Sequence, residues 1–274
     1  MGLDHLLLLA AIQGITEFIP VSSSGHLQLV HGLTAYPDHG LVIDVALHAG
    51  TLLAVMAYFY RDVGLMLAGA RDIIRRRPSA SAHLVRVLVI ASLPVLLAGP
   101  VLVALDVTDA LRKPEIVAWA SIVFAIPLWL ADRRHATRSS DIKAREGGDP
   151  QTISPHQALI IGLAQMLALI PGASRAGVTI MAGLFLGFDR TQAARFSMLL
   201  AMPVIGAFAL VGFIDLVRAG ALEALGAALV AGLLAAIFAF ATIHVFLKMT
   251  RTIGLLPFVI YRIGLGIGLL VVLA

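Results

Sequence analysis

The chain alternates long apolar runs with short polar breaks, and the length of each run decides whether it can cross a membrane. A helix needs about 20 apolar residues to span the hydrocarbon core of a bilayer. Six runs reach or approach this length: 41–60, 84–105, 116–131, 191–213, 222–247 and 253–273. The pattern therefore predicts an all-α polytopic membrane protein with about six full spans.

Four further apolar runs are too short to span, and they form two pairs, each joined by a polar segment that contains a proline. The runs 3–18 and 25–33 flank the first of these elbows, and 156–170 and 174–188 flank the second. The residue before a proline avoids the α region, so helices should end near Pro20 and Pro171. Non-helical backbone at membrane depth is tolerated only inside protein or beside water. Each pair is therefore predicted to form a re-entrant helix–loop–helix.

The second half of the chain repeats the order of elements in the first half. Sliding the sequence on itself by 151 positions places Pro20 on Pro171 and Ser23 on Ser174. Each half then gives a short helix, an elbow, a second short helix and a long span. We predict one membrane domain, 1–274, built from two repeats, 1–131 and 153–274, with a linker at 132–152.

Basic loops indicate how the two repeats are oriented. Cytoplasmic loops carry an excess of Lys and Arg, which places 61–77 and 133–145 inside. The spans 41–60 and 191–213 then run in opposite directions, so the repeats are inverted. Their elbows are expected to enter from opposite faces and to meet near the midplane, as in secondary transporters with broken helices.

Composition supports a membrane protein and excludes several classes of function. The chain is 59% hydrophobic and 13% charged, whereas soluble domains have roughly 45–50% apolar and about 25% charged residues. Zero cysteines exclude a disulfide framework, a zinc-thiolate site and thiol catalysis. The net charge of +4 is spread over loops, so no nucleic-acid partner is expected. Residues 1–19 lack a basic signal-peptide start and are expected to remain in the mature protein.

The first elbow carries a carboxylate and an amide in an apolar setting. Ionisable groups at membrane depth are costly and mark functional sites by default. Gln13 and Glu17 are four residues apart and share a helical face. They could ligate a hard divalent cation, Mg²⁺ or Ca²⁺, or Glu17 could act as a base toward water. The alternatives are a buried glutamate paired with an arginine and a glutamate shallow enough to reach water.

Three serines and a histidine follow in the same elbow. Ser22, Ser23 and Ser24 precede a helix start, where first-turn N–H groups and the helix dipole favour an anion. Simple N-capping is the alternative for any one of them. His26 could shuttle a proton or attack phosphorus, and the alternative is a structural histidine.

The second elbow supplies a cation. Ser174 can cap its helix, and Arg175 in the first turn offers a fork that matches phosphate bidentately. Thr179, four residues later, faces the same way and could add a hydroxyl donor. A snorkelling arginine is the alternative. We expect the two elbows to meet in one phosphate-handling site, and two helix N-termini there suit a ligand with two phosphates.

One polar pair lies outside the elbows. Asp44 and His48 are four residues apart on the first long span. Their spacing is equally consistent with support of the site, with helix–helix packing and with catalysis.

At these residues the sequence resembles the bacterial undecaprenyl pyrophosphate phosphatase family, which is linked to bacitracin resistance. Residues 13–26 (QGITEFIPVSSSGH) and 171–179 (PGASRAGVT) look like its two signature motifs, and 44–51 and 194–203 resemble further conserved blocks. The family's (Glu/Gln)-x-x-x-Glu motif is met by Gln13 and Glu17. Its Pro-Gly-x-Ser-Arg-Ser motif has Ala176 in place of the last serine, so that hydroxyl is missing here.

The resemblance implies hydrolysis of undecaprenyl (C55) diphosphate to undecaprenyl phosphate and inorganic phosphate, which recycles the lipid carrier for cell-wall synthesis. It also implies help from Mg²⁺ or Ca²⁺, the bacterial inner membrane as location, and a site open to the periplasm. Glu17, Ser23, His26 and Arg175 are then the catalytic candidates, and water, Ser23 and His26 remain open as nucleophile. Substrate binding falls to Arg175 and to a set of hydroxyls, Ser22, Ser24, Ser174 and Thr179.

The alternative function is a lipid-phosphate flippase or secondary transporter, because carriers share inverted repeats with broken helices. A homodimer is compatible with the sequence but not specified by it.

Overall fold

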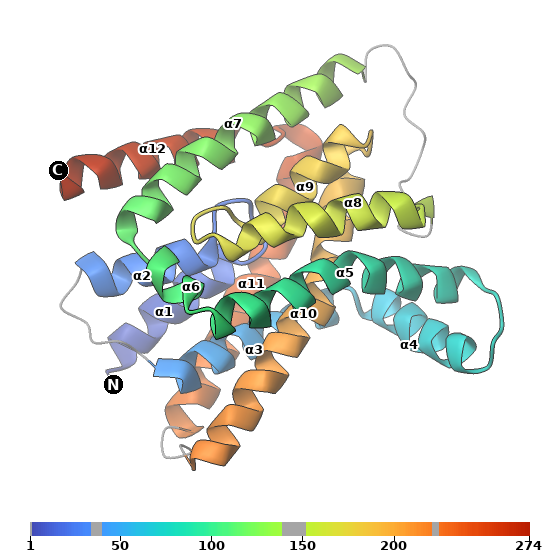
Figure 1. The fold of residues 1–274 in the computed structure, drawn as a ribbon, viewed down its shortest axis with the longest axis horizontal. Helices are drawn as coiled ribbons and strands as arrows, with labels where there is room; N and C mark the ends of the chain where they lie inside the picture. Colours follow the sequence, from blue (N-terminus) through green and yellow to red (C-terminus); the bar gives the residue numbers. More distant parts are fainter. Residues whose placement is uncertain (1, 34–39, 139–151, 221–224) are drawn as a thin grey trace.

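The computed structural model describes residues 2–33, 40–138, 152–220 and 225–274, and within these ranges it contains helices and no strands. The elements in chain order are α1 (Leu3–Thr16), α2 (Ser23–Leu33), α3 (Gly40–Tyr58), α4 (Tyr60–Ile74), α5 (Ala80–Ala104), α6 (Val107–Leu111), α7 (Pro114–Arg138), α8 (Pro155–Gln165), η2 (Met166–Leu169), α9 (Arg175–Phe185), α10 (Arg190–Ala219), α11 (Leu225–Thr252) and α12 (Leu256–Leu273). Figure 1 shows their arrangement.

Six of the described helices are long and apolar enough to cross a membrane: α3, α5, α7, α10, α11 and α12. The predicted all-α polytopic fold is thereby confirmed. The polar segment between the predicted repeats is helical up to Arg138, and 139–151 lies outside the described residues.

The two predicted elbows are present as pairs of short helices. Helix α1 has 14 residues and is about 21 Å long at 1.5 Å per residue, well short of a span of about 30 Å. In the second elbow, α8 tightens into η2 before the chain turns and starts α9. Figure 1 shows the loop between α1 and α2 beside the loop between η2 and α9, near the centre of the molecule. The elbows therefore meet, as the sequence predicts.

The two elbow loops each contain a capping serine with a positive φ, and these serines are 152 residues apart. Ser22 and Ser174 both have left-handed backbones, with φ of 75° and 71°. The Oγ of Ser22 accepts from the N–H of Gly25 at 3.4 Å, and the Oγ of Ser174 accepts from the N–H of Gly177 at 3.1 Å. Ser22 is therefore the structural equivalent of Ser174. Sliding the sequence by 151 positions instead matches Ser174 with Ser23, the next residue. Left-handed non-glycine residues are costly and cluster at functional sites.

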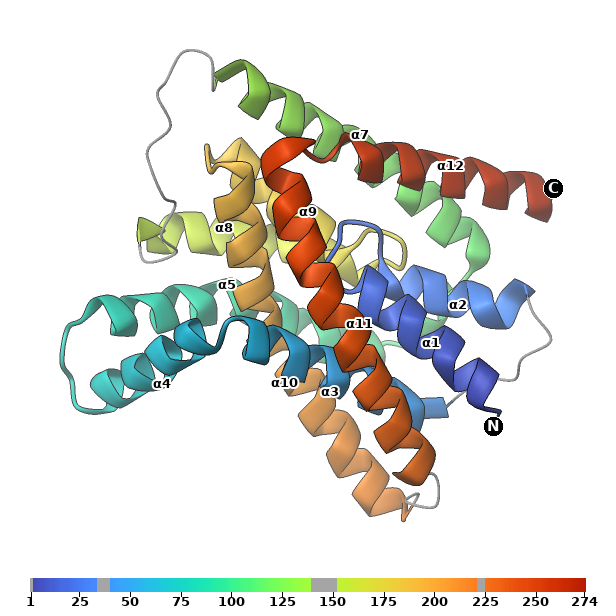
Figure 2. The same ribbon diagram turned by 180° about the vertical axis from the view of Figure 1, so that it is seen from behind.

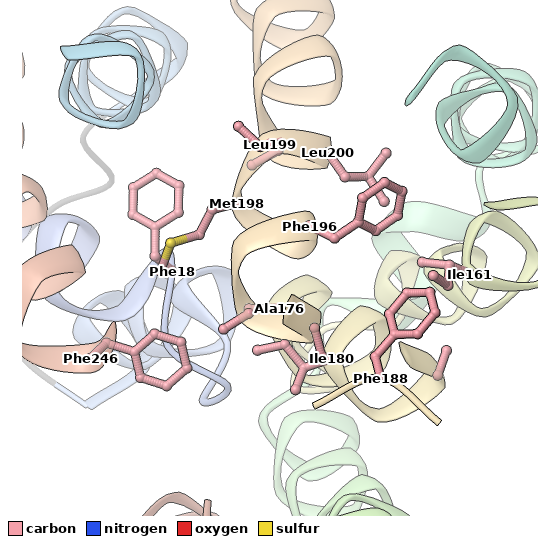
Figure 3. Close-up of a cluster of buried hydrophobic side chains, with 14 of the residues drawn as sticks. Phe18, Ile161, Ala176, Ile180, Phe188, Phe196, Met198, Leu199, Leu200 and Phe246 are labelled. Atoms are coloured by element: carbon pink, nitrogen blue, oxygen red, sulfur yellow. The ribbon is translucent and has the colours of Figure 1, made fainter. Parts of the chain in front are cut away.

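Long helices pack around the elbows through a shared core. Figure 3 shows Phe196, Met198, Leu199 and Leu200 of α10 among Phe18, Ala176 and Ile180 of the elbows, and these side chains are buried. Figure 2 shows α11 crossing beside α1, and α12 lying beside α7. This packing fixes the elbow helices against α10.

Helices α3 and α11 approach closely at a pair of glycines. A Cβ added to Gly50 would lie 2.0 Å from the carbonyl oxygen of Gly232. Small residues allow such close backbone approach between membrane helices. The crossing holds α3 beside the elbows, so that its inner face can contribute to the site.

Candidate active site

An ion pair joins the two elbows. Nη2 of Arg175, the first residue of α9, lies 3.2 Å from Oε1 of Glu17, which directly follows α1. The side chains of Arg175 and Glu17 are 12% and 7% exposed. Arg175 also donates to the carbonyl of Ser197 on α10 at 3.1 Å. Its guanidinium is thus held at the start of α9 by two other elements.

The other oxygen of Glu17 binds the rest of the first elbow. Oε2 accepts from Oγ of Ser23 at 2.6 Å and from Nε2 of Gln13 at 3.0 Å. With the Arg175 contact the carboxylate accepts three side-chain hydrogen bonds. Gln13 is fully buried on the preceding turn of α1, so it fixes the orientation of Glu17.

A cavity of about 220 Å³ opens at this ion pair. It is lined by elbow residues and by residues of α3, η2 and α10: Glu17, Ser22, Ser23, Ser24, His48, Ala168, Ser174, Arg175, Val204, Ile205 and Phe208. Ligand pockets for drug-sized molecules measure about 300–1,000 Å³. The cavity therefore suits a phosphate headgroup and not a long hydrocarbon chain.

Six of the predicted site residues are brought together in this lining, and they come from both elbows: Glu17, Ser22, Ser23, Ser24, Ser174 and Arg175. These six residues form a polar wall, in which the serines and Arg175 lie at the starts of α2 and α9 and Glu17 lies just after the end of α1. Helix starts present free N–H groups and the positive end of the dipole. This wall can bind an anion.

His26 is held by hydrogen bonds behind the cavity lining. Its Nδ1 lies 2.7 Å from the carbonyl of Ser22, which can only accept, so Nδ1 donates. Its Nε2 lies 2.6 Å from the hydroxyl of Tyr261 on α12, and the two rings stack with centroids 5.7 Å apart. Both ring nitrogens are therefore engaged, and the ring supports the left-handed turn at Ser22.

Gln13 and Thr179 also lie outside the lining. Thr179 donates to Oγ of Ser197 at 2.7 Å and lies 2.8 Å from the carbonyl of Arg175. Thr179 thus links the first turn of α9 to the helix that holds the Arg175 side chain.

Arg262 on α12 is a central residue that the sequence reasoning missed. Its side chain is fully buried. Its guanidinium donates to five carbonyls, those of Pro20 at 3.1 Å, Ala120 at 3.3 Å, Ser121 at 3.2 Å, Gly172 at 2.9 Å and Ala173 at 2.9 Å. Carbonyls of both elbow loops thus bind the same guanidinium, and this fixes the distance between the two loops. An arginine inside a predicted span is a signal for a functional role and could have revealed it.

A second bond between the loops is direct. The N–H of Gly172 donates to Oγ of Ser22 at 3.2 Å. The serine that caps α2 therefore also binds the backbone of the second elbow.

The donor set allows only a weakly held cation. The described residues contain no group of three or more His, Asp or Glu side chains placed to hold a metal ion. Oε1 of Gln13 is buried without a hydrogen-bond partner among the described residues, beside the Glu17 carboxylate. Mg²⁺ is commonly bound through one or two carboxylates together with substrate phosphates. Glu17 and Gln13 fit a cation of that kind, held largely by the substrate.

Comparison with known proteins gives consistent matches over the whole chain. A family model described as bacitracin resistance protein BacA matches residues 6–268. A protein of Maricaulis maris (strain MCS10) named undecaprenyl-diphosphatase is 45% identical over 275 residues, covering 99% of both chains. Proteins of the same name from Ruegeria pomeroyi and Teredinibacter turnerae are 41% and 44% identical over 271 residues, covering 97–98% of each chain.

Proposed function

Because the chain belongs to the bacitracin resistance protein BacA family, we propose that it hydrolyses undecaprenyl diphosphate to undecaprenyl phosphate and inorganic phosphate. The observation that carries this proposal is the cavity lined by residues of both elbows, with Glu17 and Arg175 in contact at 3.2 Å. The reaction returns the lipid carrier to cell-wall synthesis. The names of the relatives lend no support to the alternative, a flippase.

Binding of the diphosphate is assigned to the polar wall. Catalysis of phosphoryl transfer consists mostly of positioning and charge stabilisation. The Arg175 fork binds the terminal phosphate, assisted by the N–H groups that start α2 and α9 and by the hydroxyls of Ser22, Ser24 and Ser174. Thr179 acts indirectly, by fixing the turn that carries Arg175. A divalent cation at Glu17 and Gln13, Mg²⁺ or Ca²⁺, would neutralise further phosphate charge.

Ser23 is our choice of nucleophile because its hydroxyl lies 2.6 Å from Glu17, which is nucleophile–base geometry. The oxygen of Ser23 forms a bond to the terminal phosphorus and its proton passes to Glu17. The bond between that phosphorus and the bridging oxygen breaks, and undecaprenyl phosphate leaves. Water then attacks the phosphoserine and releases inorganic phosphate. His26 orients the serine turn through its bond to the Ser22 carbonyl.

Trapping of labelled phosphate tests this assignment. Quenching a reaction with terminally ³²P-labelled prenyl diphosphate should leave label on the wild-type protein and none on Ser23→Ala. Label retained in Ser23→Ala and lost in His26→Ala would assign the nucleophile to His26. Absence of label in every variant, with phosphate still released, would indicate direct attack by a water that Glu17 deprotonates.

Phosphate release by the purified protein in detergent tests the activity itself. An enzyme works there, whereas a carrier needs two compartments. Glu17→Ala should abolish release, and Glu115→Ala, at an exposed glutamate outside the cavity lining, should not. Full activity of Glu17→Ala would overturn the proposed site.

Location and membrane side are also part of the proposal. The six spans make the chain a multi-pass membrane protein. We assign it to the bacterial inner membrane with the cavity open to the periplasm, where the recycled lipid is released, and with the prenyl tail between the spans. A cysteine introduced at Ser24 in this cysteine-free chain should react with an impermeant maleimide added outside intact cells or spheroplasts. Reaction only after the membrane is opened would contradict the periplasmic assignment.

A further inference from the structure

His48 on α3 lies outside both elbows and lines the same cavity. Two contacts fix its ring. Nδ1 lies 2.8 Å from the carbonyl of Asp44, one turn earlier, and therefore donates to it. The ring packs against Phe208 of α10, with centroids 4.8 Å apart and a tilt of 58°.

These contacts leave Nε2 as the ring nitrogen turned away from α3. No hydrogen bond to this atom is recorded among the residues that the structure describes. His26 is different, since both of its ring nitrogens are bonded and its ring is not part of the cavity lining. Of these two histidines, His48 is therefore the one placed to donate into the cavity.

The wall that carries His48 is otherwise apolar. Its α10 residues are Val204, Ile205 and Phe208, and they face the cavity together with His48. The polar wall carries the Glu17–Arg175 pair. The cavity thus has one wall suited to a phosphate and one wall suited to hydrocarbon, with a single imidazole on the second.

The charged side chains that line the cavity cancel each other. Among the lining residues, the negative charge of Glu17 offsets the positive charge of Arg175. A diphosphate brings at least two negative charges, and an imidazole with a proton on each ring nitrogen carries a positive charge that can bind one of them. In that form His48 donates from Nε2 while Nδ1 keeps its bond to Asp44.

We infer that His48 binds the phosphate that stays with the lipid. The diphosphate then lies across the cavity, with its terminal phosphate on the polar wall and its first prenyl carbons on Val204, Ile205 and Phe208. This inference rests on the proposed function and adds to it the direction in which the substrate enters. His48 is thereby a substrate-binding residue that selects diphosphate esters over free phosphate.

Steady-state kinetics in detergent test the inference. With a prenyl diphosphate as substrate, His48→Ala should raise KM by about tenfold to hundredfold, the value of one hydrogen bond to a charged group. The turnover number should change little, because the terminal phosphate is still held by Arg175. Inhibition by inorganic phosphate, which needs only the polar wall, should be unchanged.

His244→Ala is the matched control. His244 on α11 contacts the hydroxyl of Tyr58 at 3.4 Å and does not line the cavity. Its removal should leave KM unchanged. If His48→Ala folds poorly, as judged by its thermal unfolding midpoint, His48→Gln and His48→Asn are measured instead, with the same expected rise in KM.

Three results would overturn the inference. KM of a folded His48 variant could equal that of the wild type, turnover could fall with KM unchanged, or inhibition by phosphate could weaken in parallel with KM. If the wild-type protein releases no phosphate, the proposed hydrolysis itself is wrong. In that case binding of a methylene-bridged prenyl diphosphonate is measured by calorimetry, and an affinity at least about tenfold weaker in His48→Ala still supports the inference, whereas equal affinity overturns it.

Discussion

The two elbows share a capped helix start and differ in chemistry. Each loop places a serine in the left-handed region at the helix start, Ser22 in one and Ser174 in the other, and each serine caps its own helix. The next residue is Ser23 in the first elbow and Arg175 in the second. Equivalent positions thus carry the nucleophile candidate and the phosphate clamp. The repeated loop provides two helix starts suited to an anion, and the proposed mechanism divides the catalytic roles between them.

Arg262 links the two elbow loops by hydrogen bonds. It comes from neither elbow and binds carbonyls of both, at Pro20 and at Gly172 and Ala173. The spacing between Glu17 and Arg175 therefore depends on a residue of α12 that does not line the cavity.

The largest expected effect comes from removing the clamp of the second elbow. Arg175→Ala should lower turnover of a prenyl diphosphate by about 10³-fold or more, because an arginine that stabilises phosphoryl transfer contributes about 10³–10⁵. Arg175→Lys should recover little, since an ammonium lacks the bidentate fork. Phosphate release measures both, with Arg86→Ala, at an exposed arginine of α5, as control. Turnover within tenfold of wild type in Arg175→Ala would mean that the second elbow does not hold the reacting phosphate.

The next effect comes from loosening the link between the elbows. Arg262→Lys keeps the charge but cannot reach five carbonyls, so the loops should shift and turnover should fall by about 10- to 100-fold, as expected for small misplacements in an active site. The thermal unfolding midpoint should fall as well.

Arg190→Lys separates this positioning effect from a general loss of stability. Arg190 forms a two-point ion pair with Asp132, at 2.5 and 3.0 Å, outside the cavity lining. Its substitution should lower the unfolding midpoint and leave turnover unchanged. Equal losses of turnover in Arg190→Lys and Arg262→Lys would show that Arg262 acts through stability alone.

The smallest effect concerns the two capping serines. Glycine suits a left-handed backbone, but it removes the Oγ acceptor. Ser22→Gly loses the bonds from Gly25 and Gly172, whereas Ser174→Gly loses the bond from Gly177. Ser22 also contacts the hydroxyl of Ser24 at 3.3 Å, but Ser24 is exposed and water can replace that bond. Ser22→Gly should therefore be less stable than Ser174→Gly by about 1 kcal/mol, one hydrogen bond, in denaturant or thermal unfolding. Equal stabilities, or the reverse order, would show that the Ser22–Gly172 bond does not contribute.

Much of this arrangement could be predicted from the sequence, because local patterns determine it. Run lengths identified the six spans, and prolines in polar segments marked both elbows. The clustering of Glu17, the serines and Arg175 followed from the expected meeting of the loops, which the 3.2 Å contact confirms.

What the sequence did not reveal depends on contacts between distant residues. The partner of His26 is Tyr261, 235 positions away, so its ring orientation had no local signal. Arg262 occurs in an apolar helix without a motif, and only the fold shows the carbonyls around it. The two repeats share few identical residues, so the sequence did not reveal that Ser22 and Ser174 are equivalent positions 152 residues apart. Their φ angles and helix caps show this equivalence.

A double-mutant cycle of Glu17→Gln, Arg175→Ala and their combination tests most directly whether the two elbows form one site. Turnover of a prenyl diphosphate is measured in detergent for the wild type and the three variants. Groups that act as a unit are strongly non-additive, so removing both should cost little more than removing the more damaging one. The account predicts a double variant within about tenfold of the slower single variant. Losses that multiply independently would contradict a shared site.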